Sequence, residues 1–212
     1  MVTPKRKDAQ QLTELILETA RDLFTQHGVD TVSMHQIAKT AGVGQATMYR
    51  RYAQKGDLCL ELIDDQFSRL RAEIDGQLER LTDAPVLERL IAVFRRIIMF
   101  THNEASLLKA IHVSLVQSRC LNADAQQFFC SQPYLYLHGT LASLLKEALD
   151  SGQTVSFEPT FTAHIMIAAL APHTLQHLSD QYGYTTDDII DQLIRTLIRP
   201  LFHSFDKAAL DV

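Results

Sequence analysis

The chain has 212 residues, of which 46% are hydrophobic and 8% aromatic, so it is long enough to bury a real core and does not have the composition of a disordered protein. Its net charge of −5 argues by itself against a nucleic-acid partner. The charge is divided unevenly, however: residues 1–55 hold eight basic and five acidic side chains, whereas residues 56–212 hold twelve and twenty.

The N-terminal part is predicted to be a short basic arm followed by helices. The arm, Thr3 to Lys7, suits both a solubilising tail and a contact to DNA, and its composition does not separate the two. Asp8 to His27 carries apolar side chains at helical spacing, and Gly28 is expected to end this helix.

Residues 33–52 have the pattern of a helix-turn-helix. Ser33 is a suitable N-cap, because its hydroxyl can accept a hydrogen bond from an unpaired backbone N–H. Gly42 is expected to end the first helix, since a residue without a Cβ adopts the left-handed conformation at no steric cost. A second short helix follows from Gln45 to Tyr52, which is the order that the motif requires.

The second short helix carries side chains that are suited to DNA. Gln45 and Thr47 lie near its N-terminus, where glutamine can pair with adenine and the threonine methyl can touch thymine. Donors for phosphate oxygens follow at Tyr49, Arg50, Arg51 and Lys55. Replacing Gln45 by alanine should therefore relax the preference at one base pair, whereas Lys55→Ala should weaken binding to every sequence.

The rest of the chain is predicted to be helical, because no segment shows sustained period-two alternation. A helix from Asp57 to Leu81 is long enough to act as a lever between two domains. Further helices are expected over Pro85–His102, Glu104–Gln117, Pro133–Asp150, Pro159–Tyr182 with a kink at Pro172, and from Thr185 or Thr186 to Lys207, with a loop over Arg119–Asp124 and a helical turn over Ala125–Phe129.

The segment SMHQIAKTAGVGQATMYRRYAQKGDL resembles the DNA-binding domain of TetR-type transcriptional repressors. It departs from that pattern at Gly44 and Gly56, where Ser and Glu are common. The resemblance implies an all-α fold, with a three-helix DNA-binding domain over residues 1–56 and a larger helical domain for effector binding and dimerisation over residues 57–212. The DNA contacts are then expected from Ser33, His35, Gln45, Ala46, Thr47, Tyr49, Arg50, Arg51 and Lys55.

In TetR-type proteins the helices after the DNA-binding domain enclose a small effector. Large or polarizable side chains of the middle helices are therefore candidates to line a mainly apolar pocket, although ordinary core packing gives the same pattern. The candidates are Phe94, Met99, Phe100, Glu104, Ile111, His112, Leu115, Tyr134, His138 and Met166.

The last two predicted helices carry more apolar surface than the packing of one helix pair needs. This surplus predicts a twofold homodimer, which would pair two DNA-binding domains with a palindromic operator in double-stranded DNA. The side chains expected at the interface are Leu175, Leu178, Ile190, Leu193, Ile194, Leu197, Leu201 and Phe202.

No motif predicts catalysis, a cofactor, a metal or a membrane. The three cysteines lack CxxC spacing, and the pair His173 and His177 has no third ligand marked by the sequence. The longest apolar run, Ile165 to Pro172, is too short for a membrane span, and a cytoplasmic protein is expected.

The pattern favours a ligand-responsive repressor of transcription that is not an enzyme. The alternative is a small helical enzyme or ligand carrier with an incidental basic N-terminal domain.

Overall fold

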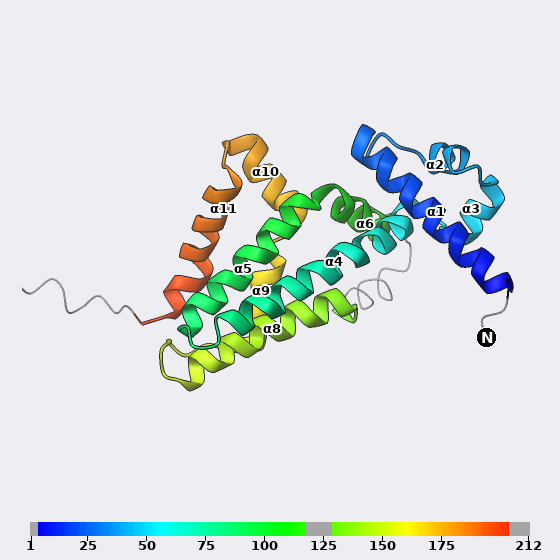
Figure 1. Ribbon diagram of the computed structural model, residues 1–212. Coiled ribbons are helices and arrows are strands. Elements are labelled where there is room, and N and C mark those ends of the chain that lie inside the picture. Colours follow the sequence, from blue (N-terminus) through cyan, green and yellow to red (C-terminus); the bar gives the residue numbers. More distant parts are fainter. Residues whose placement is uncertain (1–3, 118–128, 204–212) are drawn as a thin grey trace, which may run out of the picture. The chain divides into compact units, whose positions relative to one another are not determined.

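The computed structural model describes residues 4–117 and 129–203, which are built of helices (Figure 1). The chain divides into two compact units, residues 1–68 with 104–125 and residues 69–103 with 126–212. In the described ranges β-type pairing is limited to one bridge between Thr154 and Phe202, so the all-α class is confirmed. The domain boundary expected at residue 56 stays a prediction.

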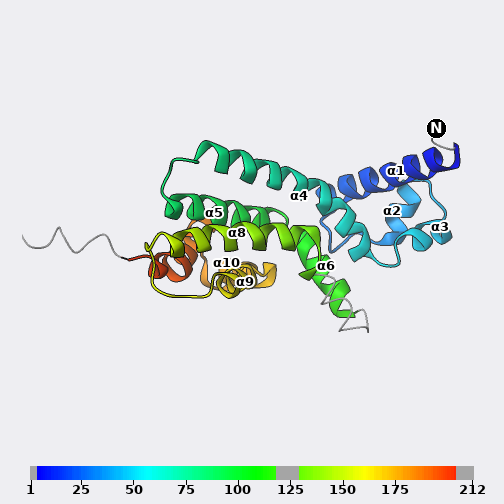
Figure 2. The same cartoon turned by 90° about the horizontal axis from the view of Figure 1, so that it is seen from below.

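The first unit holds the helices around the predicted DNA-binding motif. These are α1 (Pro4–His27), α2 (Met34–Thr40), α3 (Gln45–Arg51), the first part of α4 (Lys55–Arg80) and α6 (Ala105–Gln117). Within this unit α1 packs on α2, and α2 packs on α3 (Figure 2). α1 begins four residues earlier than expected, at Pro4, because proline is well tolerated in the first turn of a helix. The predicted basic arm is therefore helical from Pro4 onward.

The second unit is organised around α5 (Val86–Asn103), which is packed against α8 (Gln132–Asp150), α10 (Pro172–Tyr182) and α11 (Thr186–Leu193). α9 (Pro159–Ala168) covers another side of α8. Seven side chains of α5 are buried, because neighbours on several sides leave this helix with little solvent-facing surface. The fully buried side chains of this unit include Leu90, Phe94, Ile98, Leu141, Leu145, Met166 and Ile190.

The single kinked helix expected over Pro159–Tyr182 is wrong. The chain forms two helices here, because α9 ends at Ala168 and α10 begins anew at Pro172. Ala171 has an extended ψ of 127°, the conformation that a following proline favours. The proline thus ends one helix and starts the next, since its ring suits the first helical position.

The last helix starts as predicted but ends early. Thr185 accepts from the backbone N–H of Asp188, and the Asp188 carboxylate accepts from that of Thr185, which completes a capping box. α11 ends at Leu193 and continues as a π-helical turn over Ile194–Ile198 and a 3₁₀ turn over Arg199–Leu201. Pro200 has no N–H with which to extend an α-helix, which explains why the helix does not run on to residue 207 as expected.

Two other expectations fall on residues 118–128, which lie outside the described residues. They are the loop over Arg119–Asp124 and all but the last residue of the turn over Ala125–Phe129. Among the described helices, none combines the length and the apolar character needed to cross a membrane.

Candidate nucleic-acid interface

The turn between α2 and α3 is a Schellman motif. Ser33 caps the start of α2 by accepting from the Gln36 N–H at 3.1 Å, as predicted. At the other end the Gly42 N–H donates to the Lys39 carbonyl and the Val43 N–H to the Ala38 carbonyl. Gly42 has φ +66°, the left-handed conformation that this motif requires and that only glycine adopts without cost. The turn therefore determines the direction in which α3 leaves α2.

One side of α3 is buried and the other is exposed, polar and basic. Met48 is fully buried and Tyr52, directly after the helix, is 3% exposed. Residues 31–56 contain four lysine or arginine side chains and no carboxylate. The predicted DNA contacts on α3 are exposed or, for Thr47, half-buried: Gln45, Ala46, Thr47, Tyr49, Arg50 and Arg51. A helix with this distribution can offer its polar side to an anionic partner.

Two of the predicted DNA contacts bind each other. The Gln45 side-chain amide donates to Nδ1 of His35, so the imidazole proton is then on Nε2. This bond joins the start of α3 to the first turn of α2 and limits the rotamers of Gln45. The Gln45 amide oxygen and the second amide hydrogen remain available for base edges.

Tyr52 connects α3 to α4, a role that sequence periodicity alone did not reveal. Its hydroxyl donates to the Glu61 carboxylate at 2.6 Å. Burial, together with the negative charge of Glu61, raises the pKa of Tyr52 to about 12, so the hydroxyl remains a donor at any physiological pH. The bond therefore supports the exit of α3 while its ring fills the core.

Lys55 is bound to the protein's own backbone. Its ammonium donates to the carbonyl oxygens of Val29 at 2.7 Å, Val32 at 2.8 Å and Asp30 at 3.4 Å. These carbonyls belong to the loop between α1 and α2. The loop over residues 28–33 is thus bound by two lysines. Lys55 is the first residue of α4, and the ammonium of Lys109 on α6 pairs with the Asp30 carboxylate at 2.9 Å.

The comparisons with known proteins agree with this geometry. The family model described as bacterial regulatory proteins, tetR family, matches residues 16–62, the span from α1 through the start of α4. Residues 16–62 are thus similar to the N-terminal part of tetR-family regulators. The residues that carry the match include the capped α2, the Gly42 turn and the exposed α3.

An HTH-type transcriptional regulator of Staphylococcus aureus is 45% identical to this chain over 58 residues. That match spans 27% of this chain and 31% of the relative.

Solved structures are similar over more of the chain but at lower identity. FadR from Thermus thermophilus, a TetR-family repressor in complex with lauroyl-CoA, has a TM-score of 0.67 at 21% identity and covers 92% of this chain and 98% of its own. A putative regulator from Saccharomonospora viridis in complex with choline has a TM-score of 0.63 at 19% identity, with coverages of 92% and 100%. These structures show the shared fold.

The residues predicted to line an effector pocket belong to both compact units. In the second unit Phe94 and Met166 are fully buried in the core, Phe100 is half-buried, and Met99 is 38% exposed. Glu104 and Ile111 belong to the first unit, where partial burial raises the pKa of Glu104. The side chains of His112 and Leu115 lie outside the described part of the chain. The role of all these candidates as pocket residues stays a prediction.

Tyr134 and His138 are brought together with Phe129 and with His164, which the sequence did not single out. The Tyr134 hydroxyl is hydrogen-bonded to Nδ1 of His164, and the Phe129 ring meets that of Tyr134 edge-on at 5.0 Å. His138 Nε2 lies 3.1 Å from the Thr160 carbonyl oxygen. His164 gave no signal in the sequence, because its partner is thirty residues away on another helix. This aromatic cluster joins α8 to α9.

Three of the eight side chains predicted at the dimer interface are buried within one protomer. Leu175, Ile190 and Ile194 are buried in the second unit's own core. The remaining five, Leu178, Leu193, Leu197, Leu201 and Phe202, are half-buried. Packing of α5, α10 and α11 on one another therefore uses part of the apolar surface that the sequence suggested for a dimer, and the predicted interface stays a prediction.

His173 and His177 are exposed on α10, and the His177 ring meets the Tyr182 ring edge-on at 5.7 Å. In residues 4–117 and 129–203 no three metal-binding side chains come together.

The Lys55 bonds lead to a stability prediction. Lys55→Met should lower the free energy of unfolding by about 2 kcal/mol, because three carbonyls lose a charged donor. Arg50→Gln removes the same charge from an exposed site and should change stability by less than about 0.5 kcal/mol. Urea unfolding followed by circular dichroism measures both. Equal effects of the two substitutions would show that the loop bonds contribute nothing.

Proposed function

We propose that this TetR-type chain is a ligand-responsive, sequence-specific DNA-binding regulator of transcription that acts as a repressor. The observation that carries the proposal is the exposed, carboxylate-free side of α3, held in place by the Schellman turn and by the buried Met48 and Tyr52. A short helix presented in this way fits the major groove of double-stranded DNA. The similarity of residues 16–62 to known transcriptional regulators supports the same conclusion.

Within this proposal Gln45 and Thr47 read base edges, while Arg50, Arg51 and Tyr49 contact phosphates. Ser33, His35 and Ala46 border the same surface. His35 has a second role, since its bond to the Gln45 amide orients that amide before DNA arrives. A side chain held in this way loses less rotamer freedom on binding than a free glutamine would. Lys55 contributes chiefly by holding the loop that supports α2.

Selection of bound sequences from a random duplex pool tests the DNA-binding proposal. Wild-type protein should enrich one palindromic sequence with half-sites about one helical turn, or a multiple, apart. On the enriched duplex, Gln45→Ala should relax the preference at one base pair per half-site at a cost of roughly 1–3 kcal/mol. Arg50→Gln should weaken binding to all duplexes alike and lower the salt slope by about 1 per protomer.

Enrichment of no sequence would contradict sequence-specific binding. A Gln45→Ala variant with unchanged preference would remove Gln45 from the base-reading set.

The response to a ligand is proposed to act through the loop over residues 28–33. α4 and α6 each place a lysine on this loop, through Lys55 on its carbonyls and Lys109 on Asp30. A ligand that displaces α4 or α6 would move the loop and, with it, the start of α2. Because linkage is reciprocal, a releasing ligand must bind the DNA-free form more tightly, and DNA must weaken ligand binding by the same factor.

Calorimetric titration in the presence and absence of the selected duplex tests this response. Lauroyl-CoA and choline, the molecules bound in two structures of similar fold, are suitable first probes. A releasing ligand should bind about 5- to 150-fold more weakly in the presence of DNA. The Lys109→Gln variant, which breaks the pair with Asp30, should reduce that ratio. Equal affinity with and without DNA would show that the tested ligand is not an effector.

We also propose that the regulator is a homodimer, and that the interface includes α9. Phe161 is 65% exposed and Ile165, one helical turn further, is 42% exposed. Together they give α9 an apolar stripe that is not buried in its own protomer. In a twofold dimer the stripe of one protomer contacts the same stripe of its partner, so Phe161 and Ile165 of both protomers would be buried. The half-buried residues at the end of α10 and beyond α11 can extend such an interface.

The double substitution Phe161→Asp with Ile165→Asp should convert the dimer to a monomer, because it places four carboxylates in an apolar contact. Light scattering at micromolar protein concentration gives the mass. Val155→Asp is the matched control, since Val155 is also 42% exposed but lies outside α9. A wild-type monomer would contradict the dimer, and a dimeric double variant would exclude this stripe from the interface.

A further inference from the structure

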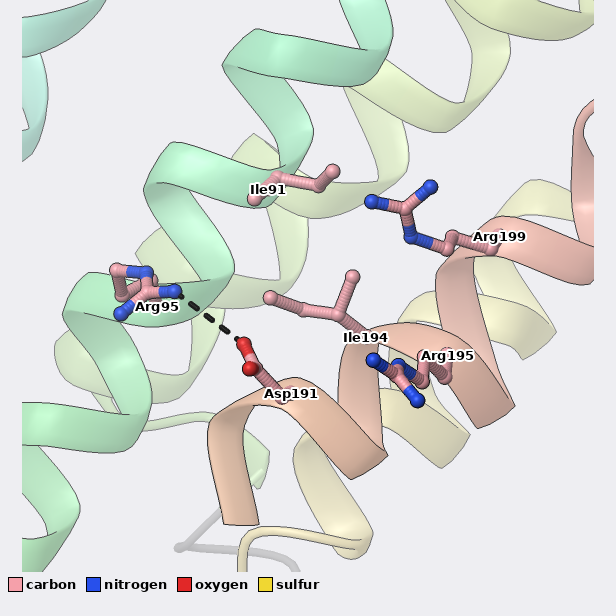
Figure 3. Close-up of a pocket in the computed structure, with 6 residues that line it drawn as sticks. All are labelled: Ile91, Arg95, Asp191, Ile194, Arg195 and Arg199. Carbon is pink, nitrogen blue, oxygen red and sulfur yellow. Dashed lines mark ion pairs between the residues drawn. The ribbon is translucent and has the colours of Figure 1, made fainter. Parts of the chain in front are cut away.

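A small cavity in the second unit is bordered by three arginines. It measures about 150 Å³ and lies between α5 and the end of α11 (Figure 3). Pockets for whole drug-sized ligands usually measure roughly 300–1,000 Å³. This cavity therefore suits one chemical group or a small ion. It is lined by Ile91, Arg95, Asp191, Ile194, Arg195 and Arg199.

The π-helical turn after α11 brings the arginines of this segment to the cavity. The Arg199 N–H donates to the Ile194 carbonyl, five residues back, instead of to the carbonyl four residues back as in an α-helix. Figure 3 shows Ile194 at the cavity with Arg195 beside it. Arg199 lies on the side of the cavity opposite Asp191. Such π turns inside helices occur frequently at functional sites.

The charges around the cavity are not balanced. Arg95 is shared between two carboxylates, those of Asp187 and Asp191, each at 3.5 Å. In the part of the chain that the structure describes, neither Arg195 nor Arg199 forms an ion pair with a carboxylate. Three guanidinium groups and one carboxylate line the cavity, and Asp187 adds a second carboxylate beside Arg95, which leaves an excess of one positive charge.

We propose that this cavity binds a phosphate group, either as free inorganic phosphate or as the end of a phosphorylated organic molecule. Phosphate at neutral pH carries one to two negative charges, and an excess of positive charge favours such an anion. Guanidinium groups donate two parallel N–H bonds to phosphate oxygens. The isoleucine side chains supply an apolar wall, against which the organic part of a phosphate ester can lie. The site uses no residue assigned to DNA or to the dimer stripe on α9, so it does not depend on either proposal.

Titration with inorganic phosphate at constant ionic strength, followed by ³¹P NMR line broadening and calorimetry, tests the site. Wild-type protein should bind one phosphate per protomer. The Arg195→Gln and Arg199→Gln variants should each weaken binding about tenfold, because each removes a charge-assisted contact. Arg80→Gln is the matched control, since Arg80 is exposed in the same unit but does not line the cavity. It should leave phosphate affinity unchanged.

Phenyl phosphate and benzoate distinguish the possible ligands. Tighter binding of phenyl phosphate than of inorganic phosphate, lost in Ile91→Ala, identifies a phosphorylated organic ligand, whereas equal binding identifies free phosphate. Benzoate that binds as tightly as phenyl phosphate would overturn the assignment to phosphate. The absence of saturable phosphate binding by wild-type protein, or an equal loss in Arg80→Gln, would overturn the site itself. Circular dichroism of each variant shows that it is folded.

Discussion

The candidate DNA-reading helix has only seven residues, and this is the constraint on which the N-terminal unit depends. Isolated helices much shorter than about 12–15 residues are marginal in water, because the first turn costs more conformational entropy than its hydrogen bonds return. α3 must therefore be held from outside. Met48 anchors it to the core, the Gly42 turn fixes its beginning, and Tyr52 ties its end to Glu61 on α4.

Gly44 makes this external support more important. It is the N-cap of α3 and has no side chain that could accept from the first backbone N–H groups, so only its carbonyl takes part, accepting from the N–H groups of Thr47 and Met48. The preceding helix, α2, does have a side-chain cap, because the Ser33 hydroxyl accepts from a backbone N–H there. The two short helices thus start differently: α2 is capped by a side chain, whereas α3 depends on the turn before it and on the His35–Gln45 bond beside it. Apart from His35 and Gln45, the contacts that position the exposed side of α3 do not use side chains proposed to touch DNA.

The second unit uses its apolar residues mainly on itself. α5 is packed against three helices, and this packing absorbs residues such as Phe94 and Ile190, which the sequence pattern had suggested for an effector pocket and a dimer interface. Two surface features of this unit differ in chemistry from each other: the apolar stripe on α9 and the arginine-lined cavity between α5 and α11. Burial inside the protomer thus decides which apolar residues are left for partners.

The sequence alone determined the all-α class, the helix-turn-helix and the ends of most helices, because caps, glycine turns and helical periodicity act over a few residues. Ser33, Gly42 and Thr185 behave as their local chemistry requires. The break at Pro172 and the early end of α11 were missed, since a proline that removes one helical hydrogen bond can bend, divide or end a helix, and the sequence pattern is the same in all three cases. Lys55 shows the same limit at the site. Its position and charge are suited to a phosphate, but only the tertiary structure brings three loop carbonyls, more than twenty residues away in the chain, within reach of its ammonium. The cavity arginines were not singled out at all, because a charge on a helix surface becomes part of a site only when folding places another helix opposite it.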